Sequence, residues 1–247
     1  PLGDYWASRL GTASALRALN DAWGHNFYKV PAEATVDQEI ADAALGGNEL
    51  VIDVQVHFMG DSREQSDFAV RVKEYMQTVA TDRFKGMDSV TGYNLSEFIR
   101  CVYLESETAV AILTSSPGDI SNNYLPNLEI AGTRELIDRM AGTGRLLNHT
   151  IIHPNAPGDL DQMEAFRDKY DPCGWKLYTM HGEENWLGGH RGWMLDDEDC
   201  GMPFLERTQK MGVNLICVHK GVSGLAPTGS PEDVGPAAKA FPGIKFL

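Results

Sequence analysis

The sequence predicts an α/β fold of the (β/α)8 barrel (TIM-barrel) type, with strands one to about six present in these 247 residues. Short apolar runs alternate with amphipathic segments of helical spacing, which is typical of right-handed βαβ units and a parallel sheet. No G-x-G-x-x-G or G-x-x-x-x-G-K-[S/T] motif follows a strand, which argues against the open sheets that bind nucleotides. Polar residues instead gather at the carboxyl ends of several strands, where barrel enzymes place their active sites.

The apolar runs and the amphipathic segments define the predicted elements in chain order. Strands are expected at 50–58, 109–113, 146–153, 174–180, 214–219 and 244–247. Between them, helices are expected at 129–141, 160–170 and 202–211.

The chain divides into two parts in this interpretation. Residues 1–48 form an N-terminal helical extension packed on the main domain, and residues 49–247 form the barrel. The extension begins with a helix around 13–23. Thr35 and Gln38 occupy the first and last positions of a capping box, which predicts that a second helix begins there.

Composition and charge exclude two classes of partner. The formal net charge is −14, from 35 acidic and 21 basic residues, and no cluster of Lys or Arg is present to neutralise nucleic-acid phosphates. The longest apolar runs are also far too short to span a bilayer. We therefore expect a small-molecule substrate, no nucleic acid and no membrane span. A homo-oligomer stays an open alternative.

The four cysteines favour a reducing compartment. Cys101, Cys173, Cys200 and Cys217 show no CxxC spacing, and Cys217 lies inside a predicted strand. We expect reduced thiols and a cytoplasmic protein. An exported precursor is the alternative, because a chain that begins at Pro1 can already have been processed.

The first predicted strand has one polar side. A period of two places Asp53, Gln55 and His57 on one side, and the other side carries Ile52, Val54, Val56 and Phe58. In a barrel the apolar side would face the helices and the polar side the interior, where these groups need a metal ion or a hydrogen-bond network. A polar strand at the edge of a sheet is the alternative.

A second histidine ends the fifth predicted strand. His219 follows an apolar run and precedes a glycine turn, so it belongs to the same face of the barrel as His57. One such histidine is usually structural, but two at equivalent strand ends favour a shared divalent ion.

The fourth predicted strand places Lys176 and Tyr178 on one side. A lysine inside a barrel has to be paired, modified or deprotonated, because a bare buried ammonium is costly. A functional lysine and a structural ion pair with Asp53 remain equally open.

Four short motifs follow one another along the predicted strands. They are Asp-x-Gln-x-His at 53–57, Gly-Trp-Lys-Leu-Tyr at 174–178, Gly-Trp-Met-Leu-Asp-Asp at 192–197 followed by Pro203, and Val-His-Lys-Gly at 218–221. Together these motifs resemble the amidohydrolase-related (amidohydrolase 2) family of the amidohydrolase superfamily, which includes metal-dependent hydrolases and decarboxylases of aromatic and muconate-type acids. The resemblance covers about residues 49–247, with the motifs in the order expected for strands one to six.

The resemblance implies a divalent metal ion, with zinc expected. His57 is similar to the second histidine of the strand-one motif and His219 to the strand-five ligand. Gln55 stands where the family has a histidine or a glutamate, and an amide oxygen is a weaker zinc ligand than imidazole. The family's strand-six histidine, last two strands and strand-eight aspartate have no counterpart up to Leu247, so we expect a barrel that is incomplete at its C-terminus.

The resemblance also implies roles for other residues. His219 and Lys176 are expected to be catalytic. Tyr178 and His181 would line the substrate pocket, and His190 and Arg191 could pair with a substrate carboxylate. A solvated loop is an equal alternative for the last two.

Three functions follow from these features. The first is hydrolysis of a small carboxylate- or amide-containing substrate, which can be aromatic, by metal-activated water. The second is non-oxidative decarboxylation of an aromatic or muconate-type acid, which the same fold supports. The third is a metal-free barrel that serves as a binding or assembly subunit.

Overall fold

The computed structural model describes residues 8–23, 30–45, 51–60, 94–116, 125–180, 192–221 and 227–247. The chain separates by its internal contacts into two compact units, Pro1–Leu50 and Val51–Leu247. Each unit is described by itself. Among the described helices, none is long and apolar enough to cross a membrane.

The first unit is a small helical cluster. It contains α2 (Arg9–Trp23), the 3-10 turn η1 (Ala32–Thr35) and α3 (Gln38–Leu45), which pack around Ala13, Val30, Ala34 and Ala41. Both predicted helices are therefore confirmed.

The predicted capping box is wrong. Asp37 caps α3, because its Oδ1 accepts hydrogen bonds from the backbone N–H groups of Glu39 at 2.9 Å and Ile40 at 3.1 Å. The Thr35 hydroxyl instead donates to the carbonyl of Ala32 at 2.8 Å within the preceding 3-10 turn. Because Thr35 belongs to that turn, the N-cap is Asp37 and the helix begins at Gln38.

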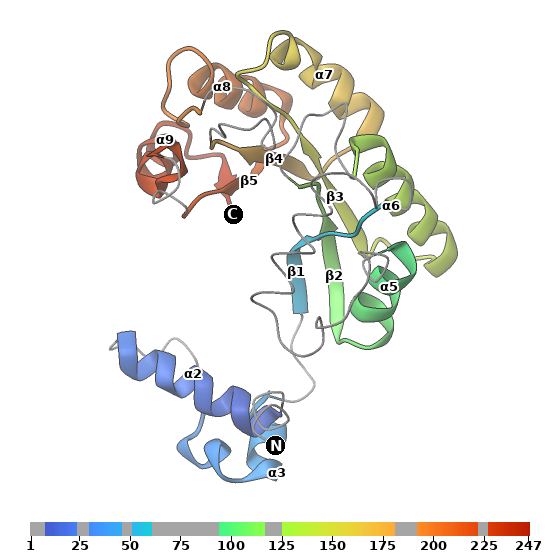
Figure 1. Cartoon of the computed structure of the whole chain (residues 1–247), viewed down its shortest axis with the longest axis vertical. Coiled ribbons are helices and arrows are strands. Elements are labelled where there is room, and N and C mark those ends of the chain that lie inside the picture. The colour runs from blue at the N-terminus through green and yellow to red at the C-terminus, as the bar shows by residue number, and fades with distance from the viewer. Residues whose placement is uncertain are drawn as a thin grey trace, which may run out of the picture. The chain divides into compact units, whose positions relative to one another are not determined.

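The second unit contains one sheet of six parallel strands in sequential order. The strands are β1 (Val51–Val56), β2 (Thr108–Leu113), β3 (Leu146–Ile151), β4 (Gly174–Tyr178), β5 (Leu215–His219) and β6 (Lys245–Phe246). Each strand pairs in parallel with the next. Figure 1 shows that the sheet curls and that the helices cover its convex side. This arrangement confirms the predicted (β/α) barrel architecture for strands one to six.

Four helices follow the later strands, and the first three of them agree with the predicted segments. They are α6 (Asn127–Ala141), α7 (Asp159–Tyr170), α8 (Gly201–Met211) and α9 (Val234–Ala240), with the 3-10 turns η6 (Pro227–Gly229) and η7 (Pro231–Asp233) before α9. The predicted boundaries of α6, α7 and α8 differ from the observed ones by one or two residues, as expected for frayed ends.

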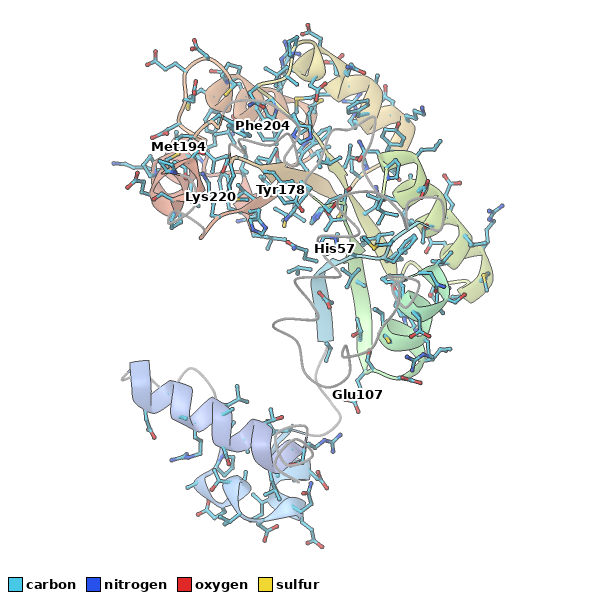
Figure 2. The ribbon with its side chains drawn as sticks, viewed as in Figure 1. His57, Glu107, Tyr178, Met194, Phe204 and Lys220 are labelled. Atoms are coloured by element: carbon cyan, nitrogen blue, oxygen red, sulfur yellow. The ribbon has the colours of Figure 1, made fainter. Side chains whose placement is uncertain are left out.

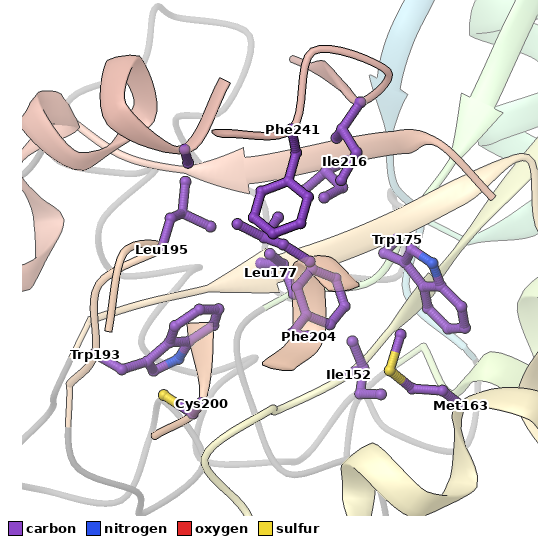
Figure 3. Close-up of a cluster of buried hydrophobic side chains, with 13 residues drawn as sticks. Ile152, Met163, Trp175, Leu177, Trp193, Leu195, Cys200, Phe204, Ile216 and Phe241 are labelled. Atoms are coloured by element: carbon purple, nitrogen blue, oxygen red, sulfur yellow. The ribbon is translucent and has the colours of Figure 1, made fainter. Parts of the chain in front are cut away.

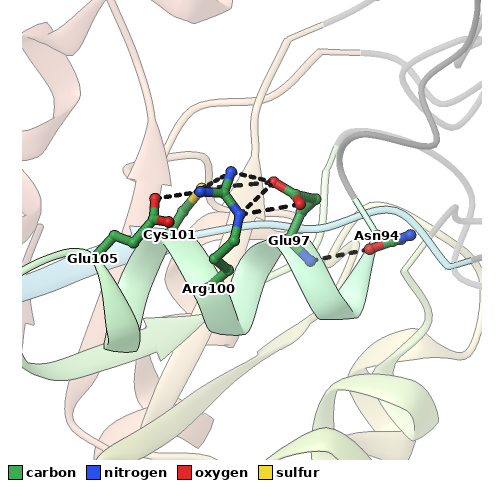
Figure 4. Close-up of polar contacts among 5 residues, drawn as sticks. All are labelled: Asn94, Glu97, Arg100, Cys101 and Glu105. Carbon is green, nitrogen blue, oxygen red and sulfur yellow. Dashed lines mark hydrogen bonds and ion pairs between the residues drawn. The ribbon is translucent and has the colours of Figure 1, made fainter.

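Besides α9, one more described helix was not predicted. Helix α5 (Leu95–Ile99) continues into the π-helical turn η4 (Arg100–Leu104), and the Asn94 side chain caps it by accepting from Glu97 N–H at 3.0 Å. On its outer face Arg100 pairs with both Glu97 and Glu105, as Figure 4 shows. A five-residue helix is too short to give a clear periodic signal.

The main core lies between β4, β5 and helix α8. Trp175 and Leu177 of β4 and Ile216 of β5 pack against Phe204 of α8, with the Trp175 and Phe204 rings edge-to-face at 6.4 Å between centroids (Figure 3). Because side chains alternate along a strand, Lys176 and its neighbours at alternate positions face the opposite, concave side of the sheet.

Strand β1 departs from the expectation that its whole apolar side would be covered by helices. Val56 and Phe58 are buried against Phe98 of α5. Ile52 and Val54 are 48% and 40% exposed. The expectation was wrong for these two residues because β1 is an end strand of the described sheet, and α5 covers only its carboxyl end.

A buried ion pair holds the segment that follows β5. Lys220 Nζ lies 2.7 Å from Asp233 Oδ2, and the same oxygen accepts from Leu195 N–H at 2.6 Å. Lys220 also donates to the carbonyl of Thr228 at 2.9 Å. These bonds fix the backbone directly after His219 to two neighbouring segments.

Candidate functional site

The concave side of the sheet gathers polar side chains from four strands. In the register of the sheet, Lys176 lies beside Cys217 and Tyr178 lies beside His219. Gln55 reaches the same face, since its side chain contacts Lys176. Figure 2 shows His57 and Tyr178 on the inner side of the curled sheet.

Lys176 is the most deeply buried charged group of this face, with no exposed surface. Its Nζ donates to Gln55 Oε1 at 2.8 Å and contacts Cys217 Sγ at 3.2 Å. It also lies 5.0 Å from the centre of the Tyr178 ring. No carboxylate of the described residues pairs with it, and burial lowers its pKa.

The predicted alternative of an ion pair between Lys176 and Asp53 does not form. The Asp53 carboxylate accepts from the backbone N–H of Gln55 at 3.1 Å instead. Asp53 still lies close enough to raise the pKa of His57 slightly against the lowering effects. A lysine with amide and thiol partners brings positive potential to the face without a neutralising carboxylate.

Gln55 connects Lys176 to His57. Its Oε1 accepts from Lys176, and its Nε2 lies 3.3 Å from His57 Nε2. On the other side of the His57 ring, Nδ1 lies 2.8 Å from the carbonyl oxygen of Thr114. A carbonyl oxygen can only accept, so Nδ1 carries the proton and Nε2 presents its lone pair toward Gln55 and the concave face.

The two histidines predicted to act together do share this face. Burial lowers the pKa of both His57 and His219, and the charge of Lys176 lowers both further. His219 is close enough to His57 to lower its pKa as well. Solvent still reaches the His57 side chain. The two imidazoles are thus favoured in their neutral forms, in which each has one ring nitrogen with a free lone pair.

The Tyr178 ring packs against the His219 ring. Their ring centroids are 5.5 Å apart, with an interplanar angle of 31°. The Tyr178 hydroxyl donates to the carbonyl of Ser115 at 2.9 Å, which ties β4 to the segment after β2. Tyr178 is only 4% exposed, so its expected contact with substrate stays a prediction.

His149 of β3 is a site residue that the sequence did not suggest. It is fully buried, and neither ring nitrogen has a hydrogen-bond partner among the described residues. Burial, with the charges of Lys176 and His57, lowers its pKa to about 3. Its ring sits beside Gly174, where an added Cβ would lie 3.1 Å from His149 Cδ2. The alternation of Leu147, His149 and Ile151 along β3 is the signal that could have placed it on this face.

The structure therefore brings together five of the predicted site residues, namely Gln55, His57, Lys176, Tyr178 and His219. The other three, His181, His190 and Arg191, lie outside the described residues. Their expected roles in substrate binding stay predictions.

Gln55 does not fit its predicted role as a metal ligand in this arrangement. The Gln55 oxygen is taken by the Lys176 amine and the Cys217 thiol, and its amide nitrogen, which is no metal ligand, faces His57. Within the described ranges, no three His, Cys, Asp or Glu side chains are grouped so that they could hold a metal. The zinc ion stays a prediction, and the chemistry below uses only the protein's own groups.

Comparisons with known proteins add little to these residues. No family model matches the sequence, and no curated protein matches it. Among solved structures, the chain is similar to 2,6-dihydroxybenzoate decarboxylase from Rhizobium, with a TM-score of 0.47 and 9% sequence identity. The alignment covers 81% of this chain and 65% of that chain. The chemistry of the site therefore has to follow from its own residues.

Proposed function

We propose that this chain provides the active site of a hydrolase that acts on a small substrate with a carboxylate or amide group. The site is the concave face at the carboxyl ends of β1, β4 and β5. One observation carries the proposal: His57 is held with Nδ1 on the Thr114 carbonyl, so that a neutral Nε2 lone pair faces an accessible surface beside a second imidazole. A neutral imidazole in this setting is a general base.

The reaction needs only two roles from the protein. His57 Nε2 removes a proton from water while the water oxygen bonds to the substrate's carbonyl carbon. The bond to the leaving group then breaks, and the leaving group takes the proton back from His57. The 3.3 Å contact from Gln55 to His57 Nε2 is long for a hydrogen bond, so a water can compete for that lone pair.

Lys176 contributes through its charge. It has no exposed surface, so it does not touch the substrate in this arrangement. Lys176 donates to the Gln55 amide, and its positive potential extends over the concave face. This potential favours binding of an anionic substrate and stabilises the negative charge that develops on the substrate's carbonyl oxygen. Lys176 is therefore a positioning residue, where the sequence predicted a catalytic one.

The test is turnover of a panel of small esters, lactones and amides that carry a carboxylate, with products identified by mass spectrometry. We expect hydrolysis by the wild type and a loss of about 10²–10⁴-fold in kcat for His57→Asn, because asparagine cannot act as a base. Lys210→Ala, on the exposed side of α8, serves as the control and should keep wild-type rates.

Two results would contradict the proposal. Full activity in His57→Asn would show that His57 is not the general base. Release of CO₂ from aromatic carboxylic acids, without hydrolysis of any panel compound, would favour the decarboxylase alternative.

A further inference from the structure

We infer that Gln55 is a positioning residue that fixes the tautomer of His57, in the place where the sequence suggested a metal ligand. The inference rests on the proposed function only for its catalytic meaning. The hydrogen-bond series from Lys176 through Gln55 and His57 to Thr114 carries the structural part.

The contacts with Lys176 determine the orientation of the Gln55 amide, and therefore which of its groups accepts and which donates. A glutamine amide can usually be turned either way, because its oxygen and nitrogen look alike. Here the atom that faces Lys176 is the oxygen, which accepts from Nζ at 2.8 Å. The Cys217 thiol, 3.3 Å from the same oxygen, provides a second donor. The Gln55 NH₂ group is therefore left to face His57.

The Thr114 carbonyl determines independently which nitrogen of His57 carries the proton. The Thr114 carbonyl can only accept, so it requires a proton on His57 Nδ1. Gln55 can only donate from its NH₂ group, so it requires a lone pair on His57 Nε2. Both ends demand the same tautomer, in which Nδ1 carries the proton and Nε2 carries the lone pair. Moving the His57 proton to Nε2 would break two hydrogen bonds, and turning the Gln55 amide would break three.

The choice of glutamine at position 55 follows from this arrangement. A glutamate of the same shape would also accept from Lys176, but its second oxygen would face His57 Nε2 with another acceptor. Nε2 would then bind a proton to satisfy that oxygen and would lose its lone pair. An amide is the one side chain of this shape that accepts from an amine and donates to an imidazole nitrogen.

The experiment is a long-range ¹H–¹⁵N correlation spectrum of the full chain, labelled at its histidine ring nitrogens, stripped of metal and without substrate. His57 signals are assigned by their loss in His57→Asn. We expect the wild type to show a protonated Nδ1 and an unprotonated Nε2. In Gln55→Glu we expect the unprotonated Nε2 signal to disappear at the same pH. Gln162→Glu, an exposed position on α7, is the matched control and should leave His57 unchanged.

A wild-type spectrum with the proton on Nε2 and none on Nδ1 would overturn the inference without any variant. An unchanged His57 signal in a folded Gln55→Glu protein would overturn it too, and unchanged His149 and His153 signals would show that the variant is folded. These readouts need no turnover. A correct tautomer in a protein that hydrolyses nothing would therefore refute the proposed function and leave this inference standing.

Discussion

Lys176 Nζ donates to both Gln55 Oε1 and Cys217 Sγ, and this determines which way the Gln55 amide faces. Lys176, Gln55, His57 and His219 could be found from the sequence, since each stands on the polar side of a strand of apolar neighbours. The hydrogen bonds between these residues could not be predicted from the sequence. Lys176 and Gln55 are 121 residues apart, and no local sequence pattern shows which of their atoms come into contact. His149 was missed because the other residues on its side of β3, Leu147 and Ile151, are apolar, so alternation alone could have placed it on this face but no polar side drew attention to it.

At the residue scale, His149 should make stability depend on pH. Its pKa is 6.5 when exposed and about 3 in the fold, so the unfolded chain binds one more proton between these values. Stability from this group is therefore present above pH 6.5 and declines as the pH falls toward 3. Relative to His149→Leu, the wild type should lose about 2 kcal/mol of unfolding free energy between pH 7 and pH 5.

Urea unfolding of both proteins at each pH measures this difference. Other titrating groups affect both proteins alike, so only the change in their difference is informative. A difference that stays constant from pH 7 to pH 5 would mean that the His149 ring gains a proton as easily in the fold as outside it.

At the scale of elements, the strands and the longer helices were predictable because each buries one regular side. The boundaries were less predictable, since they depend on competing hydrogen bonds. The Thr35 hydroxyl bonds backward to Ala32, and Asp37 becomes the cap of α3. The connection between β5 and α9 was invisible in the sequence, because Lys220 and Asp233 meet only in the folded chain.

The Lys220–Asp233 pair should be a strong local constraint. The two side chains are 7% and 0% exposed, so Asp233→Asn would leave a buried ammonium without a counter-charge. We expect a loss of about 3–5 kcal/mol in unfolding free energy. The matched control is Asp161→Asn, which breaks the exposed pair with Arg207 at 2.9 Å and should cost only about 0–1 kcal/mol. Equal losses in urea unfolding would show that burial does not set the strength of the pair.

At the scale of the whole molecule, the sequential parallel sheet was predictable from the alternation of elements along the chain. The exposure of Ile52 and Val54 was not, because it depends on which segments cover β1. The net charge of the whole chain affects metal binding. A net charge of −14 attracts divalent cations to the surface in general, so the zinc content of the purified protein by itself says little about the concave face.

A comparison of two proteins with nearly equal charge separates surface binding from site binding. In Gln55→His, a third imidazole replaces the amide beside His57 and His219, and imidazole is a better zinc ligand than an amide. We expect this variant to bind its first zinc ion at least about 10-fold more tightly than the wild type, because the wild-type Gln55 oxygen is engaged by Lys176. Competition with a chromogenic chelator measures both affinities, and adding His219→Asn to the variant should abolish the gain. If the wild type binds one zinc ion as tightly as Gln55→His, and loses it in His219→Asn, the amide is a ligand after all and its bond to Lys176 gives way to the metal.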